Sequence, residues 1–334
     1  MKLKLRQNRE FGILAILVVV SAIIGLNSSV FFTVENLFDI LKSNVVLGML
    51  ALGMLLVILT GGIDVSVGSM IAAVTVIVGQ FMKHYTGNVA LALLVGCAAG
   101  TILGAVNGIL IAKMKIPPIV VTLGTLSILM GLTLYLTNGT WITGIPDSFI
   151  AFGRQTIGSF YRQGDDMIGF PVQFFFLAFA ALLTWFILKF TLFGRGIYAI
   201  GGNRVSAERV GYNIDRITIF LYAFEGFIIG MAGVVHTSIM RQVDPNAFNG
   251  FEMQVIAAVV LGGASTLGGY GSVFGTLLGV ALFTVINNGL ILMHIPTFWQ
   301  KIVVGIVLIG SIGVDVAQKR YWENRTTKVD IEEA

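Results

Sequence analysis

The sequence predicts an all-α polytopic membrane protein with about ten transmembrane helices, glycine-rich helix breaks, and both the N-terminus and the C-terminus in the cytoplasm. Three observations support this fold class. Of the 334 residues, 56% are hydrophobic and only 11% are charged, whereas a soluble domain is about 25% charged. Glycine, which lets membrane helices approach closely, occurs 41 times. Apolar segments recur at lengths suited to a hydrocarbon layer about 30 Å thick.

The candidate spans follow one another along the chain with short connections. A helix needs about 20 mostly apolar residues to cross the bilayer. The segments that meet or approach this length are 11–31, 44–60, 65–83, 89–112, 117–137, 171–190, 216–240, 251–265, 271–292 and 299–317. The first follows a basic start and has no small-residue cleavage motif after it, so we expect a retained span. Residues 1–334 are thus expected to form a single transmembrane domain.

The basic residues orient these spans. With the N-terminus inside, 15 of the 21 Lys and Arg residues fall on the cytoplasmic side, as the positive-inside rule requires. The six on the other side are Lys42, Lys83, Arg154, Arg162, Arg241 and Lys301. Two connections are longer than the rest: an external loop, 138–170, and a cytoplasmic loop, 191–215. The positive charge therefore reports topology and does not indicate a nucleic-acid partner.

Two glycine-rich stretches interrupt the helical pattern at similar places. The first runs over 60–68 and the second over 261–269. Non-helical backbone at membrane depth persists only where protein or a watery cavity satisfies it, and paired breaks are typical of a transport site. The residues that we assign to a translocation path or gate are Gly61, Gly62, Asp64, Ser66, Gly262, Gly263, Asn287 and Asn288. The alternative is a pair of ordinary turns at the cytoplasmic surface.

Polar side chains within the spans are further candidates because they are costly in hydrocarbon. The Asp64 carboxylate could accept hydrogen bonds from a substrate hydroxyl, or cap the helix that begins near Val65. The others are Asn107, Glu225, His236, Asn287 and Asn288. Each could bind a hydroxylated solute or join neighbouring helices. The adjacent Asn287 and Asn288 point in different directions on a helix, so at most one is expected to face a central path.

Several kinds of chemistry lack a sequence signal. There is no P-loop motif and no Gly-x-Ser-x-Gly elbow. His84, His236 and His294 do not have metal-ligand spacing, and the lone Cys97 can form neither an intramolecular disulfide nor a cysteine metal site. A membrane enzyme and a metal site are therefore poorly supported.

The cytoplasmic loop contains a short amphipathic helix between Asn203 and Gly211. Asn203 can cap its start, and Gly211 fits a helix stop. A helix of about eight residues is marginal alone in water, so we expect it to dock on a partner. The alternative is a solvated connector.

Four motifs resemble those of the membrane permeases of bacterial ABC importers, in the branch that serves ribose, related monosaccharides and autoinducer-2, and they occur in the same order along the chain. They are the loop from Gly194 to Gly211, the break 61–68, the segment 115–125, and Leu261-Gly262-Gly263 followed by Gly268-Gly269. The resemblance covers essentially the whole chain, although Pro118 and Tyr212 stand where the family often has other residues.

This resemblance implies a permease subunit in the bacterial cytoplasmic membrane that pairs with a second copy or a related permease. Two ATPase subunits, which would bind the ATP and Mg²⁺, would dock on a coupling surface, and this chain itself would bind no cofactor. That surface comprises Asn203, Ala207, Glu208, Arg209 and Gly211. A periplasmic or lipid-anchored binding protein would deliver a neutral solute to loops 138–170 and 241–250. The solute could be a pentose, a deoxyhexose, a galactose-like sugar or autoinducer-2.

Two other classes remain open on the residues alone. Asp64 and Glu225 could carry protons or sodium in an ion-coupled secondary transporter. A passive channel would need no docking helix.

Overall fold

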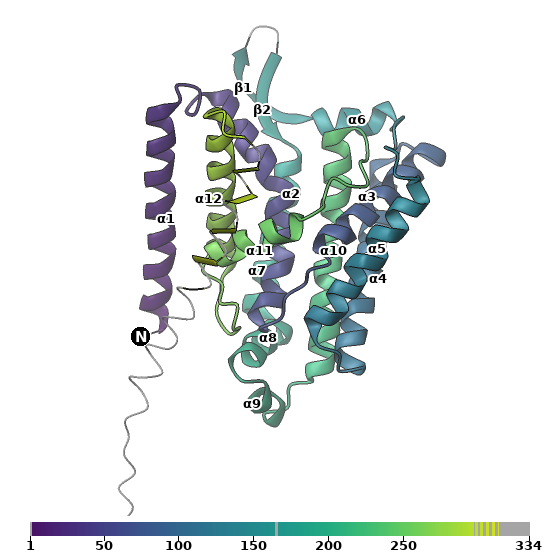
Figure 1. Cartoon of the computed structure of the whole chain (residues 1–334), viewed down its shortest axis with the longest axis vertical. Helices are drawn as coiled ribbons and strands as arrows, with labels where there is room; N and C mark the ends of the chain where they lie inside the picture. The colour runs from purple at the N-terminus through teal and green to yellow at the C-terminus, as the bar shows by residue number, and fades with distance from the viewer. Residues whose placement is uncertain are drawn as a thin grey trace, which may run out of the picture.

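The computed structural model describes residues 2–163 and 166–296, and then residues 298–299, 301–302, 305–306, 309–310 and 313. The elements are α1 (Lys2–Asn27), α2 (Val34–Leu59), α3 (Val67–His84), α4 (Val89–Lys113), α5 (Pro118–Thr137), α6 (Asp147–Arg154), β1 (Thr156–Gln163), β2 (Asp166–Pro171), α7 (Gln173–Phe190), α8 (Leu192–Gly202), α9 (Arg204–Arg209), α10 (Ile214–Met240), α11 (Phe251–Leu261) and α12 (Val273–Leu292). Most of the long helices stand side by side between two ends of the molecule (Figure 1).

The helices confirm the all-α polytopic fold. Within the described residues, eight are long and apolar enough to cross a membrane, and each coincides with an expected span: α1, α2, α3, α4, α5, α7, α10 and α12. The expected span at 251–265 differs, because α11 has only 11 residues. At 1.5 Å per residue it rises about 16 Å, roughly half of the hydrocarbon thickness. The expected span at 299–317 falls largely outside the described residues.

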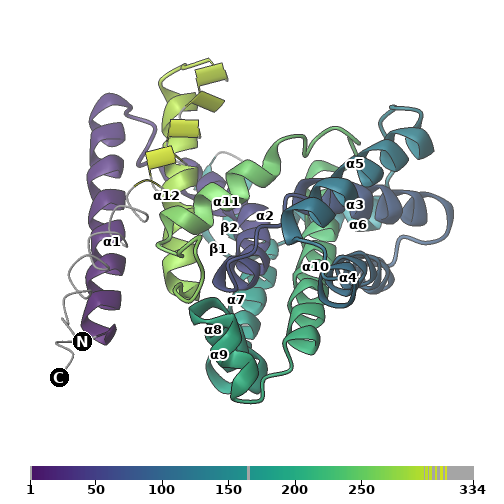
Figure 2. The same cartoon turned by 60° about the horizontal axis from the view of Figure 1, so that its bottom comes forward.

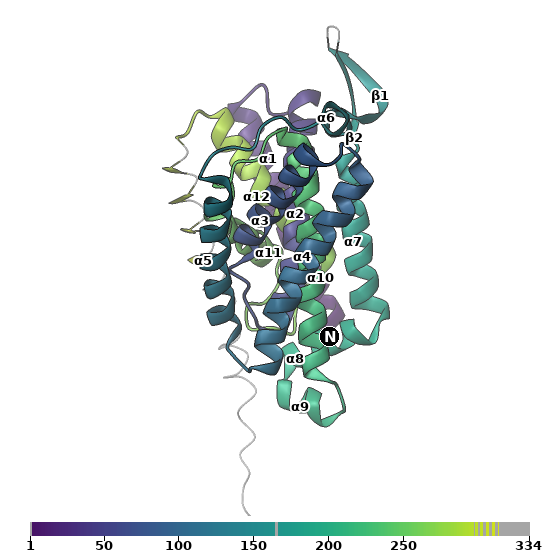
Figure 3. The same ribbon diagram turned by 90° about the vertical axis from the view of Figure 1, so that its right-hand side faces the viewer.

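The loops gather at two ends as the charge pattern predicts. The start of α1 lies at the same end as α8 and α9, and the strands lie at the other (Figures 1 and 3). Lys113 and Lys115, between α4 and α5, form ion pairs with Asp215 at the start of α10, with N–O distances of 3.4 and 2.6 Å. At the opposite end, Ile142 and Val243 form a β-bridge. We call these the inner and outer ends, following the assignment from basic residues.

Both long connections contain structure that the sequence analysis did not anticipate. The outer one folds into α6 and an antiparallel pair of strands, β1 and β2. The inner one contains α8 ahead of the expected short helix. Glycine costs a helix about 1 kcal/mol per residue, so its four glycines argued against a helix. Two of them, Gly194 and Gly196, are buried in close packing.

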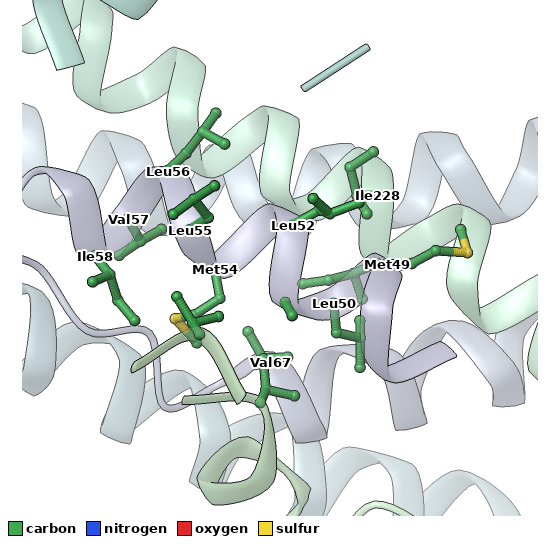
Figure 4. Packing of buried hydrophobic residues seen from close by; sticks show 14 of the residues in the cluster. Met49, Leu50, Leu52, Met54, Leu55, Leu56, Val57, Ile58, Val67 and Ile228 are labelled. Carbon is green, nitrogen blue, oxygen red and sulfur yellow. The ribbon is translucent and has the colours of Figure 1, made fainter. Parts of the chain in front are cut away.

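The core is centred on α2 and α10. From Val45 to Leu59 nearly every residue of α2 is buried, and this stretch includes uninterrupted apolar segments such as Leu50–Leu52. Figure 4 shows Met49, Leu50 and Leu52 of α2 beside Ile228 of α10, with Val67 of α3 nearby. A helical segment that is apolar all round is expected to lie inside a bundle, and residues 45–59 of α2 do so.

Helices α4 and α10 pack along a seam of glycines. A Cβ on Gly100 would lie far inside van der Waals contact with the carbonyl oxygen of Gly226, and one on Gly226 would clash in the same way with Gly100. Gly104 approaches the Tyr222 carbonyl as closely. Small residues at such an interface allow backbone-to-backbone contact, which supplies van der Waals energy where lipid removes the hydrophobic drive.

The periphery presents apolar side chains outward. In the apolar part of α1 only 6% of the residues are buried, and in the apolar parts of α4 and α5 22% of the residues are buried. Figure 2 shows α1 beside α12 at one edge of the molecule, with α4 and α5 toward the opposite edge. Exposed apolar helices of this kind require lipid or a partner helix around them.

Candidate functional site

The short helix α9 forms the tip of the inner end (Figures 1 and 3). Asn203 caps it as expected: its Oδ1 accepts a hydrogen bond of 2.9 Å from the Ser206 backbone N–H. Gly211 has φ +92°, a left-handed conformation that glycine adopts without strain, so the chain turns there toward α10. With six residues, α9 is two shorter than the sequence suggests.

The two faces of α9 differ. Ala207 is only 2% exposed and belongs to the core, so it anchors the helix and does not present the outward surface that we expected of it. Glu208 and Arg209 are exposed, and neither side chain pairs with another residue that the structure describes. Val205 and Val210 are also exposed, at 58% and 74%. These two valines were missed, although the sequence places them on or beside the short helix that we expected to dock on a partner.

The C-terminal end of α8 meets both helix breaks at one point. The Gly269 N–H donates a 2.8 Å hydrogen bond to the Leu59 carbonyl, which joins the second break to the end of α2. A Cβ on Gly201 would overlap that same carbonyl oxygen, and one on Gly268 would lie 2.9 Å from the Gly61 backbone nitrogen. We call these five residues the glycine junction.

The glycine junction brings together three stretches that the sequence analysis treated separately. Gly61 was expected at a break, but the part played by Gly201 was missed. The Gly201-Gly202 pair just before a helix cap was the available signal. Tyr198 of α8 adds a further tie, because its hydroxyl donates to the Gly271 carbonyl at 2.9 Å. The segment that leads into α9 therefore touches both breaks through backbone atoms.

The other glycines that we assigned to the breaks have distinct surroundings. Gly62 is buried, and a Cβ there would lie 3.2 Å from a Val57 methyl group and 3.4 Å from the Tyr222 hydroxyl. Gly262 packs against the start of α12, where a Cβ would lie 2.5 Å from the Gly275 carbonyl oxygen. Gly263 has φ +81° and only the Ile13 side chain near its missing Cβ. The first two are needed for close packing, and Gly263 for its backbone conformation.

A buried polar cluster lies beyond the first break. The Asp64 Oδ1 accepts from the backbone N–H of Ser66 at 2.7 Å and from its hydroxyl at 2.5 Å. The Ser66 Oγ accepts from the Asn107 amide of α4 at 3.0 Å, and the Thr125 hydroxyl of α5 donates to Asn107 at 2.6 Å. Asp64 thus fixes the turn that precedes α3 and also begins a chain of hydrogen bonds to two neighbouring helices.

Glu225 of α10 completes this cluster. Its carboxyl group lies within hydrogen-bonding reach of Asp64, and both residues are essentially unexposed. Both Glu225 oxygens and the Asp64 Oδ2 have no hydrogen-bond donor among the described residues. No ion pair in the described part of the chain reaches either acid. Two buried acids with no basic partner among the described residues are expensive inside a membrane bundle and indicate a functional position.

The two asparagines of the pair on α12 have different surroundings. Asn288 exchanges two hydrogen bonds with Asn36 of α2, at 3.1 and 2.7 Å. One turn earlier, the Thr284 hydroxyl donates to the Asn44 side chain at 2.6 Å. Asn288 thus joins two helices in this structure. Asn287 is half-buried and makes no side-chain hydrogen bond to any described residue, so it is the member of the pair still free to meet a solute.

Comparison with known proteins shows that the chain is similar to membrane permeases. Residues 36–312 match the family described as branched-chain amino acid transport system / permease component. The chain is 36% identical over 305 residues to the ribose import permease protein RbsC of Escherichia coli K12, covering 91% of this chain and 92% of that one. It is 38% identical to RbsC of Bacillus subtilis 168, covering 90% of each chain. It is also 38% identical to the autoinducer 2 import system permease protein LsrC of Yersinia pseudotuberculosis serotype O:3, covering 93% and 86%. No solved structure matches the chain.

Proposed function

This chain belongs to the family of branched-chain amino acid transport system permease components, and from that premise we propose that it is the membrane permease subunit of an ATP-driven importer. Its solute is a neutral, sugar-like molecule, of the class to which ribose and autoinducer-2 belong. The names of relatives that align over about nine-tenths of the chain support this class. The chain acts in the bacterial cytoplasmic membrane and is not itself an enzyme.

The observation that carries the proposal is the arrangement at the inner end. Helix α9 is capped at Asn203, stopped at Gly211 and anchored through Ala207, so it is a fixed projection. It exposes two charges, Glu208 and Arg209, which pair with no described residue, beside two apolar side chains. Two ATP-binding subunits would dock on this surface in the assembled importer, one on each permease copy, and they would bind the ATP and Mg²⁺.

Through the glycine junction, a movement of the docked ATPase subunit can be transmitted to the membrane interior. A displacement of α9 is passed to α8, whose Gly201 touches both the end of α2 and the second break without an intervening side chain. We assign the translocation path or gate to the residues that border these breaks, with Asp64, Ser66 and Asn287 as the polar members. Alternating access would then be a coordinated movement of both breaks.

The outer end has the features expected of a surface for a solute-binding protein. The Ile142–Val243 bridge joins loop 138–170 to loop 241–250, so these two segments form one continuous surface. A second permease copy, or a related permease, would complete the central path. A periplasmic or lipid-anchored binding protein would deliver the solute above it.

Uptake into vesicles that contain the permease, its ATPase and its binding protein tests this function. Import of labelled ribose should require ATP and survive an ionophore. Glu208→Arg should reduce import at least tenfold while the protein still inserts in the membrane. Charge reversal at Lys83, which is exposed at the outer end, is the matched control and should leave import unchanged. Import that collapses with the ionophore and needs no ATPase would instead identify an ion-coupled carrier that uses Asp64 and Glu225.

A further inference from the structure

A pocket of about 560 Å³ opens at the outer end between the first turns of α2, the last turns of α10 and the start of α11. This volume lies within the range of roughly 300–1,000 Å³ that is typical of small-molecule sites. The pocket shares no lining residue with the glycine junction or with the buried polar cluster.

One wall of the pocket is polar. Asp39, Lys42 and Ser43 of α2 line it at spacings of three and four residues, so their side chains share one helix face. Within the described part of the chain, none of the three side chains makes a hydrogen bond or an ion pair. A row of free donors and acceptors therefore faces the pocket.

The opposite wall is aromatic. The His236 ring of α10 lies 4.6 Å from the Phe248 ring, and Phe248 meets Phe251 edge-on at 5.4 Å. His236 is largely buried in a membrane helix, yet its ring nitrogens make no hydrogen bond to any described residue. Buried polar groups are normally paired, so this imidazole indicates a ligand or water in the pocket.

We propose that this outer pocket is the site where the permease receives the solute, and that the ligand is a small polyhydroxylated molecule such as a monosaccharide. Aromatic rings pack against the C–H faces of a sugar, while carboxylate, ammonium and hydroxyl groups bond its hydroxyls. The inference rests on the proposed import function. It also links the pocket to the second break, because Phe251 is the first residue of α11 and α11 ends directly at Gly262.

A branched-chain amino acid is the competing ligand. Its ammonium and carboxylate groups would pair with Asp39 and Lys42, and its side chain would meet Phe248 and Phe251. The names of the similar permeases favour the sugar, and the experiment must separate the two.

The two ligand classes are distinguished by how well each protects an introduced cysteine from chemical labelling in the assembled importer. Cys97, the one cysteine of the chain, is replaced by Ala, and Ser43→Cys is introduced into the pocket. A membrane-impermeant maleimide is then added from the outer side, with and without millimolar D-ribose, D-galactose, L-arabinose or L-leucine. A sugar that the unaltered complex imports should slow labelling at position 43 at least fivefold. Ala90→Cys, exposed at the outer end of α4, is the control and should label at the same rate throughout.

Transport kinetics provide an independent measurement. Asp39→Asn and Phe251→Leu should each raise the KM for import about tenfold or more, while ATPase stimulation by the loaded binding protein stays within twofold of the unaltered complex. Glu35→Gln, one turn before Asp39 and outside the pocket, should change neither quantity.

The outcomes distinguish a failure of the proposed pocket from a failure of the proposed import function. Sugar import with no protection at position 43, or with an unchanged KM in both variants, overturns the pocket and leaves the importer standing. Protection by L-leucine and by no sugar overturns the assigned ligand class. If the unaltered complex imports none of the sugars, the proposed function fails and the sugar site fails with it.

Discussion

The two helix breaks look alike in sequence and differ in the folded chain. The first, between α2 and α3, encloses a carboxylate that is 1% exposed and linked through Ser66 to α4 and α5. The second, between α11 and α12, contains no acidic or basic residue from Gly262 to Ser272 and is held by backbone contacts and tight turns. A Gly-Gly pair in a membrane helix thus indicates where the backbone leaves the helix, and its neighbours determine what the break can do.

The glycine junction is where the two breaks depend on each other, and it should give the largest effect. Gly201→Val places a side chain onto the Leu59 carbonyl and the backbone of Gly269, so the segments must separate. We expect import to fall by more than tenfold and the free energy of unfolding to drop by about 1–3 kcal/mol or more, as in overpacked cores. Thermal denaturation in detergent and vesicle uptake measure the two effects.

Gly202→Val is the matched control for this prediction. Gly202 directly follows Gly201, but nothing lies within 4 Å of the Cβ it would acquire. Equal damage from both substitutions would show that any disturbance of α8 matters, and would remove the special importance of the junction.

The acids beside the first break should give the next largest effect. Asp64→Asn removes the charge but keeps an oxygen for Ser66, so we expect a folded protein with import reduced about tenfold. Glu225→Gln should act on the same cluster. The double variant should therefore be less impaired than the product of the two single effects, because groups in one network are not additive. Strictly multiplicative import rates would show that the two acids act separately and that the cluster is not a unit.

Substitutions in the second break should act through the backbone conformation and not through the chemistry of a side chain. Gly263→Leu adds a side chain near Ile13 alone, but it forces a non-glycine residue into the left-handed region at a cost of about 1–2 kcal/mol. We expect a moderate loss of import. Gly263→Asn should restore most of it, since asparagine tolerates this conformation better. No recovery with asparagine would indicate that the side chain itself obstructs the path.

The smallest effect should come from the amide link between the end of α12 and the start of α2. Asn288→Ala breaks the reciprocal bonds to Asn36 and should lower the free energy of unfolding by about 1–3 kcal/mol, with import nearly unchanged. Asn287→Ala should do the reverse, with little change in unfolding and a raised KM. Chemical denaturation paired with uptake kinetics distinguishes these profiles, and a reversed pattern would exchange the two assignments.

Length and hydropathy were sufficient to predict the eight long helices, because burying backbone in lipid leaves a chain few alternatives. They were insufficient for α11, since an apolar run does not reveal where its helix ends. The caps of α9 at Asn203 and Gly211 follow from local chemistry and were predicted correctly. The inward position of Ala207 depends on how α9 is tilted against the core, which no local pattern encodes.

The site was predicted as separate parts. Asp64, Asn107 and Glu225 were recognised one by one as costly polar residues, and their convergence depends on where the first break lies relative to α4 and α10 and on how these two helices are rotated about their axes. The meeting of Gly201 with Gly61 and Gly268 is a contact between segments that are remote in sequence. Glycine content shows that some backbone approaches another, but it cannot identify the partner.

Helix α1 is synthesised long before α12, against which it chiefly packs. Ile13 lies against Leu278 and Leu282, and Ile24 against Val285. The side chain of Glu10 accepts a 2.6 Å hydrogen bond from Ser272 at the end of the second break. During synthesis α1 must therefore remain in the bilayer without its partner, which its apolar surface allows. The second break acquires its full set of neighbours only after most of the polypeptide has been inserted, so a truncated nascent chain cannot form a finished gate.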